Sequence, residues 1–183
     1  MGEKSQRELS VCSPIKTNVV EAYGSREQFL MEFNPSWMSM RDVDRKECYL
    51  GQFPTLAQIK CSYKGNTPAM LVTAYLHSLS EYAGCKEKIS EFQLKELASL
   101  IAAEWHFLKV SELALFFNDF KLGKYGKFYG NFDPMAVTIA IRQFIIERND
   151  FLCRYDQEER QRLRDEHDAD CVSYDEYLHG KGG

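Results

Sequence analysis

The amino-acid sequence predicts an all-α protein, folded as a compact multi-helix bundle with short connections. Three observations support this prediction. Apolar residues recur three and four positions apart in several stretches between residues 54 and 150, as they do along one face of a helix. Helix start and stop signals flank these stretches, with Ser, Thr or Asp before them and Gly after them. No stretch of convincing length alternates apolar and polar residues at the two-residue period of a strand.

Composition and charge indicate three regions. With 183 residues and a hydrophobic fraction of 44%, the chain is long and apolar enough for one ordinary domain with appended ends. We expect a loose N-terminal arm and an irregular or helical connection over residues 1–53, a helical core domain over 54–150 and a charged, acidic C-terminal tail over 151–183. The net charge of −4 gives no global reason to expect binding to nucleic acid or to an anionic membrane.

The first helical signal lies between residues 17 and 33. Ser25 with Gln28 three residues later fits a capping box, in which each side chain bonds the backbone N–H of the other residue. The pattern predicts either one helix interrupted at Gly24 or a shorter helix that starts from Ser25. Residues 34–53 carry aromatic side chains without a regular period, and we expect a structured connection there.

Two helices of the core follow. The first is short and spans residues 55–63. Thr67 is expected to cap the second, because Pro68 suits the first helical position, where an N–H has no partner. Gly84 fits the left-handed position that often ends a helix. The apolar face of this second helix consists of Leu71, Val72, Tyr75, Leu76, Leu79 and Tyr82.

Two more core helices are expected to begin near Ser90 and Ser111. Ser90 and Gln93 make a second capping box. The apolar face that follows consists of Leu94, Leu97, Ala98, Ile101, Trp105 and Leu108. The face of the helix that starts at Ser111 consists of Leu113, Phe116, Phe117 and Phe120.

The C-terminal part contains two further helical stretches. Asp133 is expected to cap a helix with Pro134 at its first position. The run Met135–Ile146 is apolar on most sides, which is typical of a helix buried in the centre of a bundle. Residues 156–167 are expected to form a charged helix that buries little surface.

Cysteine spacing and hydropathy predict a cytoplasmic protein with free thiols. Six cysteines are scattered along the chain, and no pair has the spacing of a zinc knuckle or a redox motif. The first residues lack the apolar region of a signal peptide, and no apolar run reaches the roughly 20 residues that span a bilayer. We therefore expect neither secretion nor a membrane partner. We also expect the cysteines to be reduced.

One stretch, from Lys121 to Asp133, is a candidate binding site, and we call it the basic–aromatic segment. It contains three lysines, three glycines and several aromatic rings, with no acidic residue before Asp133. Lysines neutralise phosphates and aromatic rings stack on bases, a combination that single-strand-binding proteins use. Glycines let a ligand approach the backbone closely. The candidate nucleic-acid-binding residues are Lys121, Lys124, Tyr125, Lys127, Phe128 and Tyr129.

The same segment also fits a plain connection between two helices. Gly123 can end the preceding helix in the left-handed conformation, and Lys121 and Lys124 suit the negative end of the helix dipole. The aromatic rings can then cover the end of the bundle core. A site for a protein partner is a third alternative, because exposed loops often carry such sites. The spacing differs from that of a nucleotide-hydrolysing phosphate loop.

No metal site, cofactor or catalytic group is predicted. The stretch Asp165–Cys171 gathers potential ligands, but it lacks the glycine and final glutamate of a calcium loop and the spacing of a zinc site. His77 lies opposite the apolar face of its helix, and His106 lies near Glu104. Nothing in the sequence pairs either histidine with a cysteine or serine nucleophile.

Around the basic–aromatic segment, the chain resembles an uncharacterised family of small all-helical bacterial proteins that is associated with mobile elements and prophage-like regions. The resemblance covers residues 54–149, and its most specific part is the motif GKYGKFYG-x-x-DPM, which begins at Gly123. It implies a helical fold. Through the mobile-element context, it also implies a replication accessory such as a helicase-loader-like adaptor. It implies no catalytic residues.

The function expected from the sequence is that of a non-enzymatic binding or adaptor protein. Its basic–aromatic segment is expected to contact single-stranded nucleic acid or a replication protein. Two alternatives stay open. One is a protein–protein interaction module without nucleic-acid contact, which docks a partner through the helix 156–167 or the region around Trp37. The other is an enzyme whose site involves His77, His106 or Glu104. The sequence does not predict the oligomeric state.

Overall fold

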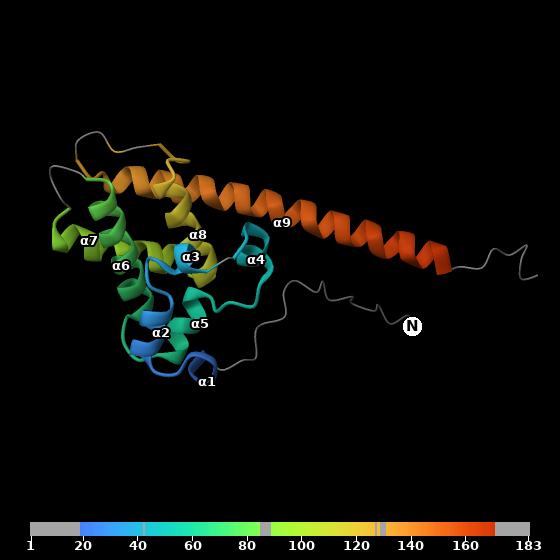
Figure 1. Cartoon of the computed structure of the whole chain (residues 1–183), viewed down its shortest axis with the longest axis horizontal. Coiled ribbons are helices and arrows are strands. Elements are labelled where there is room, and N and C mark those ends of the chain that lie inside the picture. Colours follow the sequence, from blue (N-terminus) through green and yellow to red (C-terminus); the bar gives the residue numbers. More distant parts are fainter. Residues whose placement is uncertain (1–18, 42, 85–88, 127, 129–130, 171–183) are drawn as a thin grey trace, which may run out of the picture. The chain divides into compact units, whose positions relative to one another are not determined.

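The computed structural model describes residues 19–41, 43–84, 89–126, 128 and 131–170. Within this part, the chain forms nine helices and no β-strand (Figure 1), which confirms the predicted all-α fold. The chain divides into two compact units, and the boundary between them follows Thr138, inside the last helix. The division after residues 53 and 150 that the sequence suggests stays a prediction.

Four short helices come first: α1 Val19–Tyr23, α2 Arg26–Glu32, α3 Trp37–Met40 and α4 Arg45–Leu50. Gly24, with a φ of 73°, separates α1 from α2. Ser25 and Gln28 form the predicted capping box at the start of α2. Because α1 precedes Gly24 and α2 follows it, the alternative of a helix interrupted at Gly24 is confirmed. Asp44 caps α4, because its carboxylate accepts a hydrogen bond from the Glu47 N–H at 2.6 Å.

The aromatic residues of this N-terminal part belong to the core. Phe29, Phe33 and Trp37 are almost fully buried. Phe33 and Trp37 pack on each other and on Phe53, and Tyr63 lies against Phe29. Individual buried rings, rather than a periodic apolar face, therefore anchor α2, α3 and the chain that follows α4. This explains why the sequence shows no regular pattern in residues 34–53.

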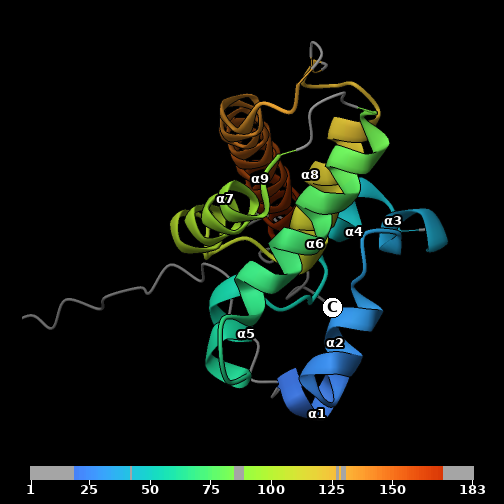
Figure 2. The same cartoon turned by 90° about the vertical axis from the view of Figure 1, so that its left-hand side faces the viewer.

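The central helices are α5 Leu56–Ser62, α6 Thr67–Tyr82, α7 Glu91–Glu104 and α8 Val110–Lys121. Helix α6 packs against α5, α7 and α8, and Figure 2 shows α6 in front of α8. The predicted capping box of Ser90 and Gln93 starts α7. The apolar faces predicted for α7 and α8 are buried along their whole length, so these two helices carry much of the core.

The two ends of α6 differ from the prediction. Asn66 occupies the cap position, and Thr67 is the first helical residue, so Pro68 stands one position later than expected. The sequence predicts Tyr82 on the apolar face, but 66% of its surface is exposed, because it lies on the last turn of the helix, beyond the buried part of that face. Gly84 follows with the expected positive φ, 60°.

Helix α8 begins at Val110, one residue before the predicted Ser111. The Lys109 N–H donates a hydrogen bond to the Glu112 carboxylate at 2.8 Å, and this contact replaces the expected serine cap. The Ser111 hydroxyl instead donates to the Cys48 carbonyl at 2.8 Å. It therefore ties α8 to α4, which is a tertiary contact that the sequence alone does not show.

The last helix, α9 Pro134–Asp170, is a single helix of 37 residues. The Met135 N–H donates to the Asp133 carboxylate at 2.8 Å, as expected for a cap. The charged stretch 156–167 is helical as predicted, but it continues the same helix, because neither glycine nor proline interrupts the sequence before it. The prediction that the run Met135–Ile146 is buried on most sides is wrong, since Met135, Ile139 and Ile146 are each more than 60% exposed.

Candidate functional site

The basic–aromatic segment begins on the last turn of α8, where Lys121 is the final helical residue. Gly123 follows with a φ of 81°, and its N–H donates to the Phe120 carbonyl at 2.9 Å. The Lys124 N–H donates to the Asp119 carbonyl at 3.1 Å. These bonds satisfy carbonyl groups that a helix end leaves without partners. Gly123 therefore ends the helix, as one of the alternatives drawn from the sequence predicts.

The aromatic rings of the segment pack on α8 and on each other. The ring centre of Tyr125 lies 5.7 Å from that of Phe116 and 6.2 Å from that of Phe120. Phe128 stacks on Phe120 at 5.3 Å, and it also lies 4.7 Å from Phe132. Rings that pack on one another have less free surface for stacking on bases. They cover the end of the core instead.

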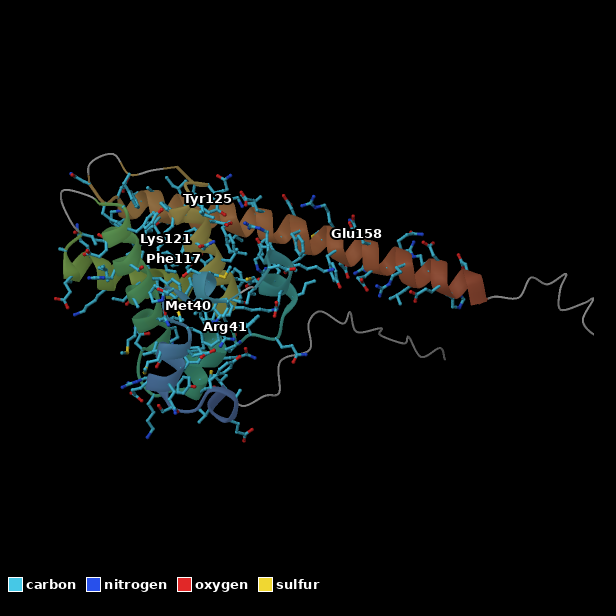
Figure 3. All side chains as sticks on the ribbon, in the orientation of Figure 1. Met40, Arg41, Phe117, Lys121, Tyr125 and Glu158 are labelled. Carbon is cyan, nitrogen blue, oxygen red and sulfur yellow. The ribbon has the colours of Figure 1, made fainter. Side chains whose placement is uncertain are left out.

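The two described lysines of the segment have no partner in common. The Lys124 ammonium pairs with the Asp119 carboxylate, with Nζ 3.3 Å from Oδ2. The Lys121 ammonium turns towards α6, where Nζ donates to the Ser78 hydroxyl at 2.9 Å and lies 5.8 Å from the centre of the Tyr82 ring. Figure 3 shows Lys121 and Tyr125 at the same end of α8, with Phe117 one turn earlier along the helix. Lys121 and Lys124 therefore do not form a single row of cations.

Lys121 lines a cavity of about 260 Å³ between the end of α6 and the turn that follows α8, and we call it the α6–α8 pocket. Its walls are mostly apolar and aromatic. A Cβ atom placed on Gly123 or Gly126 would meet no other atom within 4 Å, so these glycines leave open space beside the pocket. The lining residues are Leu79, Tyr82, Ala83, Phe120, Lys121, Gly123, Gly126 and Phe128.

The Lys121 ammonium gives the α6–α8 pocket its charge. Burial lowers the pKa of this group below the usual value for lysine. Among the described residues, Lys121 bonds to the Ser78 hydroxyl, and no carboxylate pairs with it. A partly desolvated cation without a counter-charge is unfavourable, and a bound anion stabilises it. The pocket therefore combines apolar walls with one cationic group, the Lys121 ammonium.

The pocket contains two of the six residues predicted from the sequence, Lys121 and Phe128. Lys124 and Tyr125 are outside its lining and have the internal contacts described above. The remaining two predicted residues lie outside the described part of the chain: Lys127 and Tyr129.

Among the residues that sequence reasoning did not assign to the site, Tyr82 and Ser78 interact with the Lys121 ammonium. A tyrosine on the last helical turn, just before Gly84, is a signal that could have suggested an exposed ring. No sequence signal links Ser78 to Lys121, because the contact depends on how α6 packs against α8.

A second cavity, of about 400 Å³, lies between α6 and α7. Neither cavity is lined by His77, His106 or Glu104, and all three of these residues are exposed. Within the described ranges, no group of three or more His, Cys, Asp or Glu side chains is placed to hold a metal ion. In the same ranges, no helix has both the length and the apolar character needed to cross a membrane. The second cavity is lined by Asn66, Ala69, Met70, Thr73, Lys95 and Ser99.

The fold and the pocket define an all-helical protein with a lysine-containing aromatic pocket. Residues 88–182 match the sequence model of a family of unknown function, DUF6633. The match covers more than half of the chain, and the chain belongs to this family. No curated protein and no solved structure matches it. The resemblance to an uncharacterised family is thus confirmed, whereas the association with mobile elements stays a proposal.

Proposed function

We propose that the protein is a non-enzymatic binding module that takes an apolar side chain of a partner protein into the α6–α8 pocket. The observation that carries this proposal is an apolar pocket that is flanked by exposed apolar groups. Tyr82 is 66% exposed, and Leu122, which lies in the turn between Lys121 and Gly123, is 76% exposed. At protein interfaces, a few anchors in such pockets supply most of the binding free energy.

Charge favours a protein partner over a nucleic acid. A surface for single-stranded nucleic acid needs several cations along the path of the phosphates. Lys124 is already paired with Asp119, and the whole chain has a net charge of −4. Contact with single-stranded nucleic acid, and with it a role in the replication of mobile elements, is therefore the competing outcome of the test below.

Catalysis is not part of the proposal. The described lining of the α6–α8 pocket contains no histidine, cysteine or carboxylate. A general acid or base needs a group that exchanges a proton near neutral pH and lies within hydrogen-bond reach of the reacting atom. The arrangement suits recognition better than chemistry.

Selection of short random peptides on the purified full-length chain tests the proposal. We expect the enriched peptides to share a large apolar residue. Ala83 is an exposed residue of the pocket lining, so Ala83→Trp fills the pocket without removing a core side chain. This change should weaken peptide binding by at least about tenfold, which corresponds to roughly 1.4 kcal/mol. Ala74→Trp, at an exposed position on the same helix, is the matched control and should bind like the wild type.

Two results would contradict the proposal. One is the absence of any enriched peptide, and the other is equal peptide binding by Ala83→Trp and the wild type. A thymidine oligonucleotide forms a second arm of the experiment. The nucleic-acid alternative is correct if three results are found together: the oligonucleotide binds, its binding falls steeply with added salt, and Ala83→Trp leaves that binding intact.

A further inference from the structure

We propose that the α6–α8 pocket recognises a carboxylate that lies next to a large apolar side chain, and that Lys121 binds the carboxylate. This inference rests on the proposed function and specifies the chemistry of the partner. An acidic residue or the C-terminal carboxylate of the partner chain supplies the same chemistry, and the experiment below distinguishes these two sources.

The first reason is the bonding capacity that Lys121 retains. An ammonium group has three N–H donors, and among the described residues one of them is used by the Ser78 hydroxyl at 2.9 Å. The nearby Tyr82 ring, 5.8 Å from Nζ, favours a cation at this position. Lys124 is the internal contrast, because its ammonium already pairs with the buried carboxylate of Asp119, at 3.3 Å. Of the two described lysines of the segment, Lys121 is thus the one that is placed to pair with an anion from outside.

The second reason is the size and nature of the cavity. Its volume of about 260 Å³ is below the roughly 300 Å³ at which pockets for small-molecule ligands begin. We therefore expect it to hold one side chain rather than a whole cofactor. Leu79, Phe120 and Phe128 line the same cavity as Lys121, so the apolar group and the anion of the ligand must be neighbours.

The third reason concerns the choice between a carboxylate and a phosphate. Phosphates are usually held by arginines or by several free backbone N–H groups. The N–H groups of Gly123, Lys124 and Gly126 already donate to backbone carbonyls within the turn. Among the described residues of the pocket lining, Lys121 thus offers one ammonium without such additional donors. This arrangement suits a group with a single negative charge, such as a carboxylate.

Matched peptides test this inference on the full-length chain. One pair contains Phe-Asp or Phe-Asn between blocked ends, and a second pair ends in Phe as a free carboxylate or as an amide. Each peptide is titrated into ¹⁵N-labelled protein, and its affinity is read from the amide shifts. We expect at least one carboxylate peptide to bind about tenfold more tightly than its neutral counterpart, as one charge-assisted hydrogen bond allows. The pair that shows the difference identifies the source of the carboxylate.

Two lysine variants complete the test. Lys121→Gln should remove the preference for the carboxylate and leave the weaker apolar binding in place. If Lys121→Gln does not fold, Lys121→Met is used instead. It keeps the apolar stem of the side chain but lacks the ammonium, so it should also remove the preference for the carboxylate. Lys60→Gln is the control, because Lys60 is exposed on α5, which precedes the opposite end of α6, and it should keep the preference.

The outcomes separate the inference from the proposed function. If the wild type binds both members of each pair with equal affinity, the proposed recognition of a carboxylate is wrong. Binding of all four peptides in the pocket would then still support an apolar anchor. A preference that survives Lys121→Gln also overturns the role of Lys121. If no peptide binds, both the inference and the proposed function are wrong.

Discussion

Asp119 fixes the turn that forms one side of the α6–α8 pocket. Its carboxylate is only 4% exposed, accepts two hydrogen bonds from the Arg45 guanidinium at 2.7 and 2.8 Å, and pairs with Lys124. The hydrogen bonds to Asp119 raise the pKa of Arg45 above its usual value, so the Arg45 guanidinium stays charged. One buried anion thus joins α4, the end of α8 and the following turn.

Replacing Asp119 by Ala should lower the free energy of unfolding by about 2 kcal/mol, because the guanidinium of Arg45 then lacks its charged partner. Urea unfolding of the two proteins measures this change. Asp156→Ala removes an exposed pair with Arg160 and should change the stability little. If both substitutions had the same effect, the buried network around Asp119 would not be the source of stability that we infer.

Cys48 should be the least reactive of the described thiols. It is fully buried, and desolvation raises the pKa of its thiol to about 12. The reactive form is the thiolate, so near neutral pH very little of Cys48 can react. Cys61 and Cys153 are exposed. Peptide mass spectrometry after maleimide treatment at about pH 8 should find these two modified and Cys48 intact until the protein is unfolded. Equal labelling of all three would contradict the packing of α4 against α8.

At the scale of elements, the second part of α9 should be the least stable of the described long helices. Residues 156–168 are almost entirely exposed, and ion pairs such as Asp156–Arg160 link neighbouring turns. Each such pair contributes only about 0.3–0.5 kcal/mol. We expect the amides of this stretch to exchange with deuterium far faster than those of α8, and faster still in high salt. Slow exchange there would contradict a helix held by surface ion pairs alone.

Helix starts show which parts of the fold can be predicted from the sequence. The capping boxes at Ser25 and Ser90 are correctly predicted, because both partners lie within three residues of each other. The start of α8 is not correctly predicted, because Lys109 is fixed by hydrogen bonds to a part of the chain that is distant in sequence. Its ammonium donates to the carbonyls of Tyr49 and Gly51 at 2.7 and 2.9 Å. Local hydrogen bonds can be found in a sequence, whereas contacts that depend on packing cannot.

The candidate site follows the same division. Lys121 and Phe128 could be predicted, because the composition of the basic–aromatic segment is unusual for a connection between apolar helices. The orientation of Lys121 could not, because its partner Ser78 lies 43 residues away on α6. The sequence indicates where the candidate site lies, and the packing of α6 against α8 determines which side chains line the pocket there.

For the whole molecule, we predict a loss of stability in alkaline solution. Burial raises the pKa of Cys48 to about 12 and also raises the pKa of Tyr49 and of Tyr75. In the unfolded chain, these groups lose their protons near pH 8.5 for Cys and about 10 for Tyr. A raised pKa in the folded state gives stability that is present below the unfolded pKa and is lost as the pH rises through the folded pKa.

Urea unfolding at several pH values measures this effect. We expect a steady free energy of unfolding up to about pH 8 and a continuous fall above about pH 9. A free energy that stayed constant to about pH 11 would mean that these side chains are not buried in solution.

Chemical-shift mapping of a selected peptide on the ¹⁵N-labelled chain decides most directly whether the α6–α8 pocket is the binding site. We expect the largest shifts at the backbone amides of the pocket lining, such as those of Leu79, Ala83 and Gly123. The expectation would be contradicted if the largest shifts occurred around Met70 and Ser99, at the cavity between α6 and α7, and the α6–α8 pocket showed no change.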